Sequence, residues 1–486
     1  MIRTALLITL MLLLLTATDV HAQQQDQEYV TVPVNVSIVP GLSIGDMVAR
    51  GDERVINNIS FTILWNRAAR LQGIQFGGFY SHYTEDGVGL MWTGLVNRVD
   101  SEFLGLQSSG FANIVGAQMR GIQTSGFGNV AAGSLQGVQV GGFANVAGSE
   151  ALGVQVAGFG NITGAGMDGV QVAGFGNISG AERDGVQVAG FGNIVGEGMT
   201  GVQVGGFGNL AGQSYQGVQV GGFGNLVGQS YQGVQVGGFG NLVGSSHRGV
   251  QVAGALNLVG SRGQSLQVAG LGNMVGDGLA GLQVGGLFNM VGSEVQGAQI
   301  APVNFAQTVR GAQIGLFNRS SEHRGVPIGL VSYVGDVGLA YDVHADDTGV
   351  FTGIRSGNRL FSNYLSIDFR PQGDPGATVG VQAGLGIQAP ASDALSIMAD
   401  LLTTSYLPDP DDPRYNAVHS FRGAALIRLT PRIGVFAGPR VSLYTAEIGH
   451  EALEDLAGLR FWDETTGTLR LQGYVGFSAG LRLFGR

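Results

Sequence analysis

Glutamine and asparagine recur at fixed places in this chain, and their amides are its most regular source of polar chemistry. Gln155 and Gln219 occupy the third position of a repeating unit, whereas Asn161, Asn225 and Asn289 occupy the ninth. An amide both donates and accepts hydrogen bonds, so these columns could line a pore or bind a glycan. Amides stacked at a regular spacing also form structural hydrogen-bond ladders, and we favour that interpretation.

Two acidic clusters are the candidate metal sites. The segment 408–413 reads Pro-Asp-Pro-Asp-Asp-Pro, and calcium prefers such carboxylates, but the spacing is not that of a calcium-binding loop. A solvated external loop is the simpler interpretation. His344, Asp346 and Asp347 form the second cluster, where we expect a turn because a metal site would need further ligands.

Catalytic chemistry has no support in the sequence. No set of residues combines a nucleophile with a base and an orienting acid. A glycan hydrolase would need carboxylates gathered on one face of the repeats, and their strand segments carry no charge. We therefore expect a non-enzymatic protein without catalytic residues, cofactor or metal.

The amide columns belong to a 16-residue unit that repeats twelve times without a gap from Gly105 to Gln296. Two 14-residue units follow, from Gly297 and Gly311. Every charged residue of the twelve units lies in the last four positions, and the first twelve positions carry none. Each unit therefore predicts an uncharged strand of about 11 residues followed by a short solvent-facing turn.

Apolar and polar residues alternate with a period of two along the predicted strand, as in β-structure and unlike a helix. One face carries Val154, Val156, Gly158, Gly160 and Ile162, and the other carries Gln155, Ala157, Phe159 and Asn161. We expect an all-β protein with one long strand per unit.

Two architectures satisfy this pattern. The favoured one is a large antiparallel barrel of outer-membrane type, with roughly 26 strands that are long enough to cross a bilayer. The alternative is a β-solenoid with one coil per unit, followed by a C-terminal domain of β-hairpins. In the solenoid, Gly158 and Gly164 would turn corners, and the Gln and Asn columns would stack as ladders.

The C-terminal segment favours a barrel. Its strands are long and amphipathic, and arginines share the polar face, as is typical of outer-membrane barrels. A soluble β-sandwich with the same alternation is the alternative. Across a hairpin that turns at residues 430–432, the apolar face carries Ala425, Ile427, Leu429, Ile433, Val435, Ala437, Val441 and Leu443. In the last strand, the apolar face carries Leu471, Val475, Phe477, Ala479, Leu481 and Leu483.

Composition limits the partners. The chain of 486 residues has a net charge of −10 and no lysine, which argues against a nucleic-acid partner. It has no cysteine, so disulfides and Cys-ligated metals are excluded. Glycine is abundant (86), but 44 % hydrophobic residues is too many for a disordered linker.

The first 22 residues resemble a secretory signal peptide, with Arg3 at its positive start and a leucine-rich core at 6–15. An uncleaved anchor is the alternative. We divide the rest into a polar leader (23–29), irregular strands and degenerate repeats (30–104), twelve glycine-rich repeats (105–296), 14-residue repeats (297–331) and C-terminal amphipathic hairpins (332–486).

The units resemble those of an uncharacterised family of bacterial surface-repeat proteins, built on Gly-Val-Gln-(Ile/Val)-(Ala/Gly)-Gly-Leu-Phe-Asn. Residues 281–289, Gly-Leu-Gln-Val-Gly-Gly-Leu-Phe-Asn, are the nearest copy. Most units here have Phe-Gly in place of Leu-Phe, as at Phe159 and Gly160.

This resemblance implies export to the envelope of a Gram-negative bacterium, at the outer membrane or the cell surface. Outer-membrane lipid is then the expected partner, and the barrel would serve as a pore or a structural element. The alternative function is that of a secreted or surface-attached solenoid, acting as an adhesin that binds a surface glycan or protein. The sequence leaves the oligomeric state open.

Overall fold

The computed structural model describes residues 28–371, 377–407, 416–448 and 458–485. They form a parallel β-solenoid of about 17 turns and a C-terminal barrel of eight antiparallel strands. The predicted all-β fold is therefore confirmed. The expected signal peptide (1–22), the leader up to residue 27 and the acidic segment 408–413 lie outside the described residues.

The chain divides into two compact units, residues 1–238 and 239–486. The elements of the first unit are β1 (Tyr29–Val39), β2 (Leu42–Ser43), α2 (Ile44–Val48), β3 (Arg54–Thr62), β4 (Trp65–Ala68), β5 (Arg70–Gly77), β6 (Tyr80–Tyr83), β7 (Gly87–Thr93), β8 (Val96–Val99), β9 (Phe103–Ser109), β10 (Ala112–Val115), β11 (Met119–Ser125), β12 (Gly128–Ala131), β13 (Leu135–Gly141), β14 (Ala144–Ala147), β15 (Ala151–Ala157), β16 (Gly160–Ala173), β17 (Gly176–Ala189), β18 (Gly192–Val195), β19 (Met199–Gly205), β20 (Gly208–Ala211), β21 (Tyr215–Gly221), β22 (Gly224–Val227) and β23 (Tyr231–Gly237).

The second unit continues the repeats and then forms the barrel. Its coil strands are β24 (Gly240–Val243), β25 (His247–Ala253), β26 (Leu256–Val259), β27 (Gly263–Ala269), β28 (Gly272–Val275), β29 (Leu279–Gly285), β30 (Phe288–Val291), β31 (Glu294–Ile300), β32 (Val303–Phe305), β33 (Thr308–Ile314), β34 (Phe317–Ser320), β35 (Glu322–His323), β36 (Val326–Ile328) and β37 (Val331–Val334). Its barrel strands are β38 (Ala340–Ala345), β39 (Val350–Gly357), β40 (Phe361–Pro371), β41 (Ala377–Pro390), β42 (Leu395–Tyr406), β43 (Asn416–Thr430), β44 (Ile433–Glu447), β45 (Leu459–Thr466) and β46 (Leu469–Phe484).

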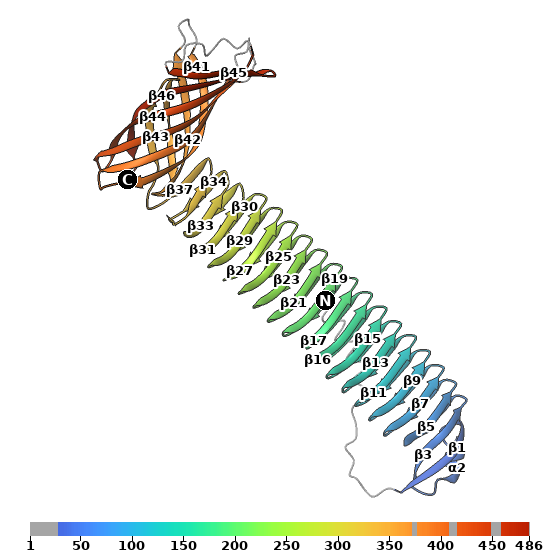
Figure 1. Cartoon of the computed structure of the whole chain (residues 1–486). Helices are drawn as coiled ribbons and strands as arrows, with labels where there is room; N and C mark the ends of the chain where they lie inside the picture. The colour runs from blue at the N-terminus through green and yellow to red at the C-terminus, as the bar shows by residue number, and fades with distance from the viewer. Residues whose placement is uncertain (1–27, 372–376, 408–415, 449–457, 486) are drawn as a thin grey trace. The chain divides into compact units, whose positions relative to one another are not determined.

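A regular coil contains two strands separated by bends (Figure 1). In one coil of the first unit, β21 has seven residues and β22 has four. Each strand pairs in parallel with the equivalent strand of the next coil, so that Tyr215 aligns with Tyr231 and Val218 with Val234. Like residues therefore stack on like, which explains why the units are nearly identical.

The repeats do not form the large antiparallel barrel that the sequence favoured. Their strands pair in parallel, and the alternative, a solenoid, is the observed architecture. The expected single strand of about 11 residues is also corrected, because β15 ends at Ala157 and β16 begins at Gly160. A strand of seven residues is shorter than the roughly 9–11 residues that a membrane-crossing barrel strand needs.

The bend at residues 158–159 also corrects the predicted faces. Phe159 was expected beside Gln155 and Asn161, but it is 41 % exposed whereas both amides are fully buried. Strand alternation stops at the bend, so the side-chain parity is reset there. A Cβ on Gly158 would lie 2.2 Å from the carbonyl oxygen of Gly142, so this corner requires glycine, as the solenoid interpretation predicted.

The fifteenth position of the unit is a second correction. It was expected in a solvent-facing turn, yet Met119, Leu135 and Tyr215 at this position are at most 3 % exposed. The reason is that the next strand begins at this residue and directs its side chain inward. The true turn is therefore shorter than four residues.

Eight strands, β38 to β44 and β46, close into the barrel. Consecutive strands pair antiparallel, and β46 pairs with both β44 and β38, which closes the ring. The strand β45 adds to the edge of β46. The C-terminal hairpins predicted from the sequence thus form a barrel of their own, smaller than the expected one.

The barrel hairpin β39–β40 covers the last coils of the second unit. The Asn358 side chain donates hydrogen bonds to the carbonyl oxygens of His323 (3.1 Å) and Gly325 (2.7 Å). Asn363 donates to the carbonyl oxygen of Pro327 (2.8 Å) and accepts from the backbone of Gly329 (2.8 Å). These bonds satisfy backbone groups that the end of a parallel stack would otherwise leave unpaired.

Candidate functional sites in the coil interior and the barrel

The glutamines of the repeats form a ladder inside the coils. Gln155 is fully buried, donates to the Oε1 of Gln139 and accepts from the Nε2 of Gln171, both at 2.8 Å. Gln219 likewise donates to Gln203 (2.8 Å) and accepts from Gln235 (2.9 Å). Because each amide donates to the preceding coil, the ladder runs in one direction.

The asparagines form a second ladder that also stabilises the bends. The Nδ2 of Asn161 donates to the Oδ1 of Asn177 (2.9 Å) and to the carbonyl oxygen of Val172 (2.8 Å). Asn225 makes the equivalent bond to the carbonyl oxygen of Val236 (2.8 Å). Asn289 donates to Asn304 (3.1 Å) and to the carbonyl oxygen of Ile300 (3.0 Å).

The five amides singled out from the sequence therefore occupy structural ladders. Gln155, Asn161, Gln219 and Asn289 are fully buried, and Asn225 is 4 % exposed. A side chain so placed offers no surface to a glycan or to a pore lumen. Their hydrogen bonds instead hold successive coils in register.

Two histidines replace the usual residue of the fifteenth column. His247 is 2 % exposed and His323 is 5 % exposed. Burial lowers the pKa of each imidazole to about 4, because the charged form loses its hydration. Both histidines are therefore neutral at physiological pH and become a source of acid sensitivity.

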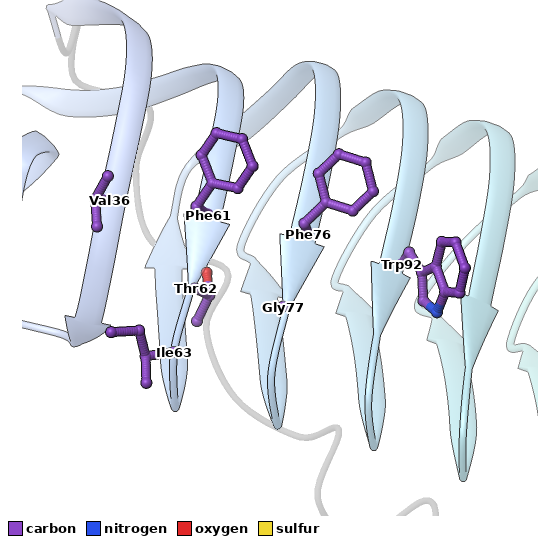
Figure 2. Close-up of a pocket in the computed structure, with 7 residues that line it drawn as sticks. All are labelled: Val36, Phe61, Thr62, Ile63, Phe76, Gly77 and Trp92. Atoms are coloured by element: carbon purple, nitrogen blue, oxygen red, sulfur yellow. The ribbon is translucent and has the colours of Figure 1, made fainter.

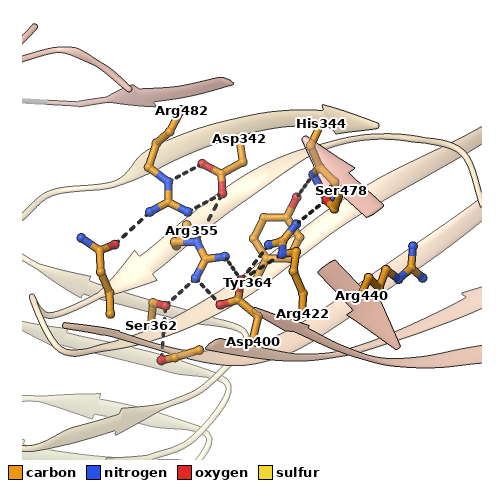
Figure 3. A network of polar contacts seen from close by, with 12 residues as sticks. Asp342, His344, Arg355, Ser362, Tyr364, Asp400, Arg422, Arg440, Ser478 and Arg482 are labelled. Carbon is orange, nitrogen blue, oxygen red and sulfur yellow. Dashed lines mark hydrogen bonds and ion pairs between the residues drawn. The ribbon is translucent and has the colours of Figure 1, made fainter. Parts of the chain in front are cut away.

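The barrel interior holds an ion-pair network (Figure 3). Asp400 receives two bonds from the Arg355 guanidinium (2.8 and 3.0 Å) and one from the Nη2 of Arg422 (2.8 Å). Asp342 receives two bonds from Arg482 (2.7 and 2.9 Å). All five side chains are at most 5 % exposed, so the charges are compensated by one another.

The cluster of His344, Asp346 and Asp347 belongs to the same interior. His344 contacts the hydroxyl of Tyr364 through Nδ1 at 3.2 Å. Arg440 forms an ion pair with Asp346 and lies 3.6 Å from Asp347. The carboxylates sit by the turn after β38, as expected, but their side chains are buried against arginine. Within the described ranges, no three His, Cys, Asp or Glu side chains are placed to hold a metal.

The outer face of the barrel is apolar. Leu401 is 63 % exposed, Phe421 55 % and Phe477 59 %. Further exposed apolar residues on these strands are Ile367, Val381, Leu385, Ile397, Ile427, Val435, Val441 and Leu443. The faces that the sequence predicted for β43, β44 and β46 are thus observed, with the apolar side outward.

Sequence reasoning missed the partners of the arginines. It placed Arg422, Arg440 and Arg482 on a polar face but did not single out Asp342 or Asp400. The available signal was a lone carboxylate inside an apolar strand, as in Ala399-Asp400-Leu401. A buried carboxylate needs a cationic partner, so each such residue predicts an inward-facing pair.

The first coils carry an open apolar pocket of about 440 Å³ (Figure 2). It is lined by Val36, Phe61, Thr62, Ile63, Phe76, Gly77 and Trp92. Because its lining carries no charge, the pocket can only select apolar groups. It lies on the outer surface of the coils and has no link to the amide ladders.

Comparison with known proteins gives no relatives: no family model, curated protein or solved structure matches this chain. In the part of the chain that the structure describes, no helix is long and apolar enough to cross a membrane.

Proposed function

We propose that this chain is a non-enzymatic envelope protein whose C-terminal barrel inserts into a bacterial outer membrane and anchors the solenoid there. The observation that carries the proposal is the inverted polarity of the barrel. Its charges, including Asp342, Asp400 and Arg422, lie inside, and its large apolar side chains lie outside.

Water is an unfavourable solvent for this outer face. Apolar surface costs about 25 cal/mol per Å² in water, and soluble monomers rarely expose contiguous patches above a few hundred Å². The exposed residues of β40 to β44 and β46 exceed such a patch, since they surround the barrel. Hydrocarbon removes this cost, and a closed ring leaves no unpaired strand edge to lipid.

Strand length and number are those of a small outer-membrane barrel. The strands β41, β42, β43, β44 and β46 have 14, 12, 15, 15 and 16 residues. About 9–11 tilted residues suffice to cross the hydrocarbon core. Eight strands is the smallest ring of this class.

The barrel serves as an anchor in this proposal and not as a pore. An eight-stranded ring leaves an interior that side chains alone can fill. Here Arg355, Arg422 and Arg482 fill it together with Asp342 and Asp400, and each is at most 5 % exposed. Ion flow would require separating these pairs.

The connections of the barrel favour a periplasmic solenoid. Short connections, at 358–360, 391–394 and 431–432, lie at the end that holds the last coils. Longer ones, at 407–415 and 448–458, lie at the opposite end. Outer-membrane barrels have short periplasmic turns and long external loops. This argues against the adhesin alternative, in which the solenoid would face the exterior.

Expression in a Gram-negative host tests the anchor. We expect the full chain to remain in the outer-membrane fraction after a carbonate wash and to migrate differently before and after boiling. Leu401→Arg places a charge on the lipid face and should lower the inserted fraction, at a cost of about 2–4 kcal/mol. The matched control Gln229→Arg, on an exposed coil turn, should insert normally. Release of the unsubstituted chain by carbonate would exclude the proposal.

A further inference from the structure

A ladder of eight phenylalanine rings lies on the outside of the first unit. Neighbouring rings are 4.8 to 5.0 Å apart, and their planes are within 7° of parallel. Each ring is 41 to 49 % exposed. The Phe ladder comprises Phe111, Phe127, Phe143, Phe159, Phe175, Phe191, Phe207 and Phe223.

Aliphatic columns extend this apolar surface on both sides of the bend. Before it lie Val140, Val156, Val172, Val188 and Val204, which are 36 to 41 % exposed. After it lie Ile178, Ile194, Leu210 and Leu226, which are 37 to 43 % exposed. We call the Phe ladder with these columns the ladder edge.

Charge is absent from the ladder edge. Every charged residue between Gly105 and Gly238 lies in the last four positions of its unit, on the opposite side of the coil. The chain carries a net charge of −10, so contact through the ladder edge brings no carboxylates together. This edge is therefore the one surface of these coils on which two copies can approach without charge repulsion.

The area is sufficient for a specific interface. A phenylalanine side chain offers on the order of 200 Å² for burial, so eight half-exposed rings present about 700 Å². The aliphatic columns add to this value. A standard interface buries about 800 Å² per partner, which the ladder edge supplies without any other contact.

The geometry of the rings selects the occupant. Sugars stack on open ring faces, but each inner ring of the ladder has both faces covered by its neighbours. A lipid surface is usually gripped by lysine or arginine beside the apolar face, and the ladder edge has neither. A second ladder has the same spacing of about 4.8 Å, so its ridge fits alongside over the full length.

We propose that the ladder edge joins two copies of this chain side by side. The copies run parallel, with a two-fold axis along the ladder, so that each ring contacts the same ring of its partner. The parallel direction rests on the proposed anchoring of both barrels in one membrane. The interface is hydrophobic and repeats its contacts in every coil.

Single cysteines test this arrangement, because the chain has none of its own. Phe159→Cys lies on the proposed two-fold axis, and we expect oxidation to convert most of this variant in outer membranes into a covalent dimer. Ala165→Cys is the matched control: it lies at the other bend of the same coil, is exposed and should stay monomeric. Disulfides need Cβ atoms about 4 Å apart, so the readout is specific to contact.

A second variant removes the interface without touching the interior. Phe127, Phe159 and Phe191 are changed together to serine, and sedimentation of the full chain in detergent should then shift from dimer to monomer. Circular dichroism verifies that the coils remain folded. A monomeric unsubstituted chain, or a dimer that survives the triple change without a Phe159→Cys cross-link, would overturn the proposal. Lipid-dependent protection of a monomeric Phe159→Cys thiol would assign the ladder edge to lipid instead. Because membrane retention is measured on the same samples, failure of the dimer is distinguishable from failure of the anchor.

Discussion

A single glutamine of the ladder has two neighbours that depend on it. Gln203 donates to the Oε1 of Gln187 (2.7 Å) and accepts from the Nε2 of Gln219 (2.8 Å), and all three side chains are fully buried. Gln203→Leu keeps the volume but leaves one buried acceptor and one buried donor unpaired. Each unpaired group costs about 1–3 kcal/mol, so we expect a loss of about 2–4 kcal/mol in local stability.

Hydrogen exchange in β19 and β21 measures this loss directly. Gln213→Leu is the matched control, since Gln213 lies on an exposed turn of the next coil. We expect exchange at β19 to be unchanged in the control. Equal protection in both variants would show that the ladder bonds contribute little to the stack.

His323 makes the last coils sensitive to acid. Burial lowers the pKa of its imidazole to about 4, whereas the unfolded residue titrates near 6.5. Above about pH 6.5 both states are neutral and the coil has its full stability. As the pH falls from 6.5 towards 4, the unfolded state takes up the proton first, so stability drops by about 2–3 kcal/mol and then levels off.

His323→Leu should remove this acid sensitivity. Leucine is already found in the same buried column at Leu135 and Leu279. We expect exchange at β33 and β36 to become independent of pH between 6.5 and 4, apart from the intrinsic chemistry of exchange. A variant that loosens with acid as strongly as the natural chain would contradict the role of this histidine.

At the scale of the element, the charged pairs of the barrel act between strands that are distant in sequence. Asp400 on β42 bonds to Arg355 on β39 and to Arg422 on β43. Asp400→Asn leaves two buried guanidiniums without their anion, which costs about 3–5 kcal/mol. We expect the barrel to lose its heat-resistant gel band at a lower temperature.

Asp463→Asn is the control for the barrel network. Asp463 bonds to Arg470 (3.0 Å) on the exposed strand β45, where an ion pair contributes at most about 1 kcal/mol. Its effect on the gel shift should be within experimental error. A similar loss in both variants would mean that barrel stability does not depend on interior pairing.

Strand elements were predictable from the sequence to different degrees. Alternation predicted the faces of β43, β44 and β46, because each of these strands is straight and long enough to show it. In the repeats the same alternation was misleading, because the chain bends at Phe159 after seven residues of strand. The ladders of Gln155 and Asn161 followed from stacking like on like, whereas the pairing of Arg355 with Asp400 depends on barrel closure and was not readable locally.

At the scale of the whole molecule, a repeat array and a barrel solve opposite problems of solvation. The coils bury amides, and each coil satisfies the amides of the next. The barrel buries charges and exposes its apolar face. Neither arrangement resembles a water-soluble core, so each depends on what surrounds or follows it. For the last coils this is the β39–β40 hairpin, which satisfies their backbone groups.

The direction of the solenoid across the membrane provides the most decisive test of the molecule as a whole. Gln229 is exposed on a coil turn of the first unit, and Thr466 is exposed beside the β45–β46 turn, at the barrel end opposite the coils. Because the chain has no native cysteine, Gln229→Cys and Thr466→Cys each report one position. With a membrane-impermeant thiol reagent on intact cells, we expect Thr466→Cys to be labelled and Gln229→Cys to be labelled only after the outer membrane is opened. Labelling of both positions on intact cells would place the solenoid outside and restore the adhesin alternative. The reverse pattern would contradict the rule that the short turns face the periplasm.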